Sequence, residues 1–144
     1  MVQFKYPALK GSDIMSNQER HAYWIELAEY DLETAKVMLT GGRYLYVGFM
    51  CHQVIEKALK GYYTCVSEDN PPYIHNLTIL SKKSNIYQLF TEDQKDIIDT
   101  LEPLNIQARY PTLKDNLLKS LTKDKCKIII DETENLFKWI KAKF

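Results

Sequence analysis

The sequence of 144 residues has few of the residues that mark several common protein classes. Its three cysteines, Cys51, Cys65 and Cys126, are odd in number and have no CxxC spacing, which argues against a disulfide framework or a zinc site. We expect reduced thiols in a cytoplasmic protein, with Cys51 and Cys126 buried as small apolar residues. No apolar run approaches the roughly 18 residues of a membrane span. Five glycines and five prolines are too few for a disordered chain.

The charges balance, because 19 basic residues face 19 acidic ones. A net charge of zero excludes a domain held on nucleic acid by overall electrostatics, although a local basic site remains possible. The length fits one domain. Residues 1–15 contain Pro7, Gly11 and Ser12 without helical periodicity, so we predict an irregular N-terminal arm followed by a folded domain over residues 16–144.

Helical patterns fill the rest of the chain. Helices are predicted over 17–39, 44–63, 75–83 (short), 91–108 and 123–143. Ser16 or Asn17 can cap the first, Gly41-Gly42 ends it, Thr91 and Gln94 form a capping box, and Pro103 interrupts the fourth. Residues 110–120 are predicted to be a loop or a fragment of helix. The expected fold is all-α: an antiparallel up-and-down bundle of four long helices plus one short helix, which dimerises to cover an apolar strip.

Two helices carry polar residues in unexpected positions. Asp31 lies at the centre of the apolar stripe of the first helix, where it would either bond a polar group of a neighbouring helix or orient a basic site residue. Gln53, Glu56, Lys57 and Lys60 stack along one line of the second helix, and Tyr46 and Phe49 extend that line. This line is either a solvated face or a binding face, in which the aromatic rings stack on a base or seat a partner helix.

Catalytic templates are lacking. The sequence has no GxGxxG, HExxH or GxSxG, and His21, His52 and His75 are scattered, so we expect neither a metal site nor a cofactor. Arg109 and Tyr110 follow the fourth helix, where a guanidinium beside a phenol suits phosphate or carboxylate recognition. The alternative is a structural arginine that bonds helix carbonyls or pairs with Asp31. His75 lies where a helix starts and could cap it.

Four short patterns in one order resemble the HEPN domain family. They are WxxxAxxDLxxA from Trp24 to Ala35, HQVIEKALKG from His52 to Gly61, IHNL from Ile74 to Leu77, and ARYP from Ala108 to Pro111. The resemblance covers roughly residues 20–142. It implies an all-α dimeric bundle in a small prokaryotic protein that partners a minimal nucleotidyltransferase in a toxin–antitoxin or related defence system.

The resemblance does not extend to the family's RNase motif, an Arg followed four to six residues later by a His. No His follows Arg109, Arg43 and His52 are too far apart, and Arg20 and His21 are adjacent. The sequence therefore favours a non-enzymatic module that binds a nucleotide or RNA through Gln53, Glu56, Lys57, Lys60, His75, Arg109 and Tyr110, with Asp31 in support, on one site in the bundle or at the dimer seam. One alternative is an atypical metal-independent RNase that uses Arg109, His75 and Tyr110. The other is a non-catalytic scaffold.

Overall fold

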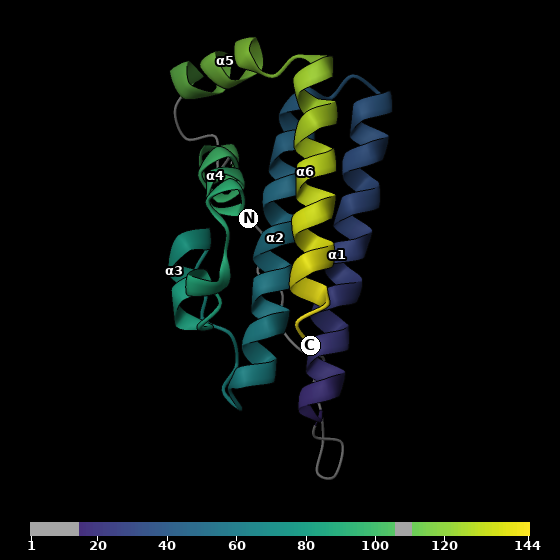
Figure 1. Ribbon diagram of the computed structural model, residues 1–144. Helices are drawn as coiled ribbons and strands as arrows, with labels where there is room; N and C mark the ends of the chain where they lie inside the picture. The colour runs from purple at the N-terminus through teal and green to yellow at the C-terminus, as the bar shows by residue number, and fades with distance from the viewer. Residues whose placement is uncertain (1–14, 106–110) are drawn as a thin grey trace.

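The computed structural model describes residues 15–105 and 111–144 (Figure 1). Three long helices, α1 (Asn17–Thr40), α2 (Tyr44–Val66) and α6 (Lys123–Lys141), lie side by side, and shorter helices cover one side and one end of them. The shorter elements are α3 (Leu77–Lys83), η1 (Tyr87–Leu89), α4 (Glu92–Leu101), η2 (Glu102–Leu104) and α5 (Pro111–Ser120). The predicted all-α bundle is confirmed, although α4 is only 10 residues long.

Local capping explains where α1 and α4 begin. Ser16 accepts from the backbone N–H of Glu19, whose side chain reaches back to close a capping box at α1. Thr91 and Gln94 form the predicted box at α4. The turn between α1 and α2 places Gly42 at a φ of 71°, a left-handed conformation that glycine adopts without strain.

The structure corrects the predicted start of the third helix and decides two other local predictions. The third helix begins at Leu77 with Asn76 as its cap, because the Asn76 side chain accepts from the N–H of Ile79; a cap at His75 is wrong. Residues 111–120 form the helix α5. Pro103 interrupts the fourth helix as expected, leaving the 3₁₀ turn η2, whereas its predicted extension over 106–108 lies outside the described residues.

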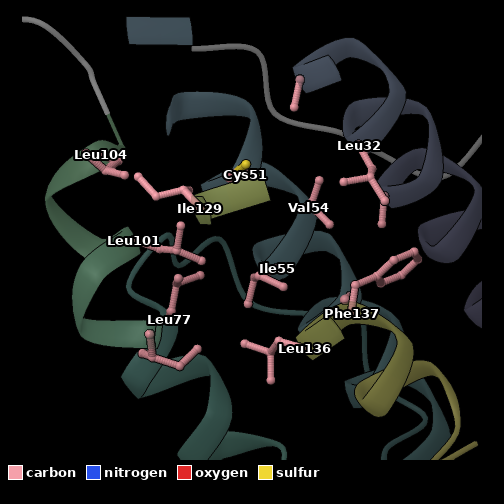
Figure 2. Close-up of a cluster of buried hydrophobic side chains, with 14 of the residues drawn as sticks. Leu32, Cys51, Val54, Ile55, Leu77, Leu101, Leu104, Ile129, Leu136 and Phe137 are labelled. Atoms are coloured by element: carbon pink, nitrogen blue, oxygen red, sulfur yellow. The ribbon is translucent and has the colours of Figure 1, made fainter. Parts of the chain in front are cut away.

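The core is built around α2, which lies between the other elements. Figure 2 shows Cys51, Val54 and Ile55 of α2 among buried side chains from five other elements: Leu32 of α1, Leu77 of α3, Leu101 of α4, Leu104 of η2, and Ile129, Leu136 and Phe137 of α6. Every residue from Cys51 to Gly61 is buried. A helix that is covered on all sides must also bury its polar residues, which positions the site described next.

The three cysteines are free thiols, and Cys51 and Cys126 are fully buried as predicted. Burial raises the pKa of the Cys51 thiol to about 12, so this residue stays protonated. Close packing of α1 on α2 depends on Gly61, where an added Cβ would lie 3.1 Å from the Cβ of Trp24.

Candidate functional site

The polar face of α2, formed by Gln53, Glu56, Lys57 and Lys60, is buried. These residues expose only 5%, 4%, 2% and 6% of their surface. The alternative of a solvated face is therefore wrong, because every residue in the middle of α2, from Cys51 to Gly61, is buried. Buried charges cost several kcal/mol unless they are paired, so the partners of these residues define the site.

Asp31 of α1 receives a hydrogen bond from the ammonium of Lys57 across the α1–α2 interface. Burial raises the pKa of Asp31 and lowers the pKa of Lys57, while the hydrogen bond and the opposite charges of the two groups favour the charged pair. Asp31 thus bonds a neighbouring helix, and the group that it orients is a basic residue of the predicted site. The interpretation of Asp31 as a bond to a polar group of a neighbouring helix is confirmed, and its role in supporting a functional site stays a prediction.

Glu56 is the centre of a second group. One carboxylate oxygen lies 3.2 Å from Lys60 Nζ, and the other lies 2.9 Å from Nδ1 of His75. Lys60 Nζ also lies 5.7 Å from the centre of the Trp24 ring, within reach of a cation–π interaction. The His75 side chain is 28% exposed, whereas those of Glu56 and Lys60 are 5% and 7% exposed, so His75 is where this group meets solvent.

His52 lies beside Glu56 in the interior of the bundle and has no exposed surface. Its ring nitrogens lie 3.9 Å from Glu56 and 3.9 Å from Glu102, and neither makes a hydrogen bond to the described residues. Burial lowers the pKa of His52 to about 4, so the ring is neutral at pH 7. Glu102 also accepts from the N–H groups of Leu77 and Thr78 at the start of α3, at 2.7 and 3.1 Å.

The same face of α2 opens into a pocket at its N-terminal end. This α2 pocket has a volume of about 360 Å³ and is lined by Met38, Arg43, Tyr46 and Met50. Tyr46 is 55% exposed, and Arg43 forms no ion pair with the described residues. The methionine side chains and the Tyr46 ring suit a planar ligand, and the Arg43 guanidinium suits a negative charge on it.

Sequence reasoning found part of this arrangement. The structure brings Glu56, Lys60 and His75 together and places Lys57 against Asp31, whereas Arg109 and Tyr110 lie outside the described residues. Sequence reasoning missed Glu102, which lies on another element, and the pocket residues Met38, Arg43 and Met50. A signal for Met50 existed, because it continues the spacing of Tyr46, Gln53 and Lys57 along one face.

A metal site is not formed by the described residues. Across 15–105 and 111–144, no three His, Cys, Asp or Glu residues come together in a way that could hold a metal ion. Over the same ranges, no helix combines the length and the apolar character needed to cross a membrane.

Comparison with known proteins identifies the fold and the family of the chain. The chain superposes on TT1696 from Thermus thermophilus with a TM-score of 0.73 and 22% identity, over 87% of this chain and 98% of that one. It superposes on ST0689, an archaeal HEPN homologue, with a TM-score of 0.64 and 24% identity, over 86% and 97%. No curated protein matches the sequence. Residues 21–143 match the HEPN domain, so the chain belongs to the HEPN domain family.

Proposed function

We propose that this HEPN protein is a dimeric binding module for a nucleotide or RNA and that it partners a minimal nucleotidyltransferase in a toxin–antitoxin or defence-type system. The α2 pocket carries the proposal. It offers Tyr46 for stacking on a base, methionine side chains for apolar contact, and the exposed guanidinium of Arg43 for a phosphate.

The middle of the polar face has a different role in this proposal. Lys57 and Lys60 already hold Asp31 and Glu56, so their charges are neutralised inside the protein. A phosphate would have to displace a buried carboxylate to reach either lysine, which costs several kcal/mol. Lys57 therefore supports the site by fixing α1 against α2 through Asp31, and Lys60 does so by pairing with Glu56 and lying over the Trp24 ring of α1. Gln53 is buried beside them. In this proposal the ligand contacts the N-terminal end of α2 together with Arg109 and Tyr110.

Dimerisation is supported by the outer surface of α1. Tyr30 and Val37 lie seven residues apart and are 73% and 64% exposed, and the half-buried Tyr23 and Leu27 continue the same line. A stripe with this spacing of three and four residues is the pattern by which two helices pack. The proposed nucleotidyltransferase partner rests on the family resemblance.

The experiment is a thermal-shift panel of mononucleotides and short RNAs on the wild type, Arg43→Ala, Tyr46→Ala and Arg109→Ala. A ligand at a hundred times its dissociation constant stabilises the fold by about 2.7 kcal/mol. We expect a rise of several degrees that is lost in Arg43→Ala and Tyr46→Ala, and in Arg109→Ala if Arg109 shares the ligand. Lys83→Ala, at the exposed end of α3, is the matched control. No shift with any ligand would refute the binding function and leave the scaffold alternative.

RNA cleavage is a second candidate, favoured by the contact between His75 and Glu56. A carboxylate that holds one nitrogen of a partly exposed imidazole leaves the ring oriented for proton transfer. The activity would be measured as cleavage of varied RNAs in EDTA, and it should disappear in His75→Ala and Arg109→Ala. Uncleaved RNA across the panel would exclude this candidate.

A further inference from the structure

Cationic residues gather at one end of the bundle. Segments 41–46 and 111–128 contain six cations and two carboxylates, a net charge of +4 on a chain whose formal net charge is zero. The cations form the basic end of the molecule: Arg43, Lys114, Lys119, Lys123, Lys125 and Lys127. All six are exposed. The remainder of the chain therefore carries a net charge of −4.

These residues share one region of space. Figure 1 shows α5 and the start of α6 at the same end of the bundle as the turn between α1 and α2. The Cys126 thiol lies 3.8 Å from the carbonyl oxygen of Tyr44, which places the first turn of α6 beside the first turn of α2. Lys127 also lines a groove with Leu39 of α1. Arg43 belongs to both the basic end and the α2 pocket, so the two surfaces are continuous.

The five lysines of the basic end are available to a ligand. Other lysines, such as Lys36, Lys57 and Lys60, form ion pairs within the structure. By contrast, Lys114, Lys119, Lys123, Lys125 and Lys127 form no ion pair within the part of the chain that the structure describes. Their charges face water, where they attract a polyanion without first breaking an internal contact.

We propose that the basic end binds the phosphate backbone of single-stranded RNA while the α2 pocket holds one unstacked base. This inference rests on the proposed function and narrows its ligand from a free nucleotide to an RNA strand. A mononucleotide fills the pocket but cannot span several lysines, whereas a strand reaches both. Stacking of a base on Tyr46 beside a cationic surface is the usual combination in proteins that bind single strands. An acidic protein surface would use the lysines but would leave the pocket empty.

The test measures the affinity of a fluorescent 12-nucleotide poly(U) RNA by anisotropy between 50 and 200 mM KCl. Contact with about three phosphates gives a slope near −2 in a plot of log affinity against log salt, a loss of roughly fifteenfold over this range. The triple variant Lys119→Gln/Lys123→Gln/Lys127→Gln should flatten this slope towards zero and weaken binding about tenfold at 50 mM KCl. Lys82→Gln/Lys83→Gln/Lys143→Gln removes the same charge from exposed positions elsewhere and should stay within twofold of the wild type.

Each contrary outcome has a separate meaning. If both triple variants lose RNA affinity equally, or if neither loses any, the basic end is not the RNA surface. Nucleotide binding at Arg43 and Tyr46 would still stand in either case. Polyglutamate that competes as well as poly(U) at equal charge assigns the surface to an acidic protein and also overturns the inference. Absence of any binding, by mononucleotide or RNA, refutes the proposed function itself.

Thermal melting verifies that both triple variants are folded. If the triple variant of the basic end is not folded, the single variants Lys123→Gln and Lys127→Gln replace it.

Discussion

The two halves of one face of α2 differ in whether their charged side chains are buried and paired or exposed. In the middle, Lys57 and Lys60 are buried and each holds a carboxylate. At the N-terminal end, Arg43 is exposed beside a pocket and holds no carboxylate of residues 15–105 or 111–144. The sequence spacing is the same in both halves, so the difference comes from what packs against them. Charges in the middle specify how the helices pack, whereas the charge at the end faces solvent beside the pocket.

The difference between the buried, paired charges and the exposed charge of α2 can be tested most strongly at Lys57. Lys57→Ala leaves the Asp31 carboxylate buried without its partner, which should lower the free energy of unfolding by about 3–5 kcal/mol in urea titrations. Arg43→Ala removes an exposed charge and should change it by less than about 0.5 kcal/mol. A double variant, Asp31→Leu/Lys57→Met, should recover most of the loss, because an apolar pair replaces the ion pair. A loss below about 1 kcal/mol in Lys57→Ala would show that the buried half is not distinguished by its pairing.

His52 makes the buried half sensitive to acid. Its pKa in the folded protein is about 4, below the value near 6.5 of an unfolded chain. As the pH falls from 6.5 towards 4, the unfolded chain takes up a proton at His52 and the folded protein does not. Stability should therefore decline by up to about 1.4 kcal/mol per pH unit, on the order of 3 kcal/mol in all.

The measurement compares wild type and His52→Gln by urea unfolding at pH 7, 5.5 and 4.5. The raised pKa of Asp31 acts in the opposite direction in this range, since the folded protein then takes up the proton first, but it acts equally in both proteins. We expect the wild type to lose stability relative to His52→Gln as the pH falls. Parallel pH profiles would contradict a neutral, buried His52.

Glu102 provides a smaller effect at the edge of the buried half. Glu102→Ala removes the acceptor for the N–H groups of Leu77 and Thr78 and should cost about 1–2 kcal/mol, measured by urea unfolding. Glu102→Gln keeps an amide oxygen that can accept from both N–H groups and should cost less than half as much. Equal losses in the two variants would mean that the carboxylate charge, and not the acceptor, stabilises the start of α3.

The smallest effect is expected where an ion pair lies in water. Lys141 Nζ lies 2.7 Å from Glu29, and both side chains are about half exposed, at 50% and 47%. A double-mutant cycle with Glu29→Gln and Lys141→Gln should give a coupling energy of at most about 1 kcal/mol, which declines further in 0.5 M NaCl. A coupling energy as large as that between Asp31 and Lys57 would show that burial does not set the strength of these pairs.

Local signals explain why much of the fold was predictable. The capping boxes at Ser16 and Thr91 and the turn at Gly41-Gly42 join residues at most four positions apart, so their partners are visible in the sequence. His75 shows where such reasoning fails. It stands one residue before the true cap, Asn76, and its ring turns instead to Glu56, 19 residues earlier in the chain.

The sequence by itself determined the long helices, the caps at Ser16 and Thr91, the buried cysteines and the HEPN family, because each depends on periodicity, on neighbours within one or two turns, or on motifs read in order. Only the tertiary structure decided that the polar face of α2 is buried, since that depends on α1, α3, η2 and α6 surrounding it. The partners of Asp31, Glu56 and Glu102 lie 26, 19 and 25 residues away. Contacts of that separation follow from packing, and packing also left Arg43 and the lysines of the basic end facing water.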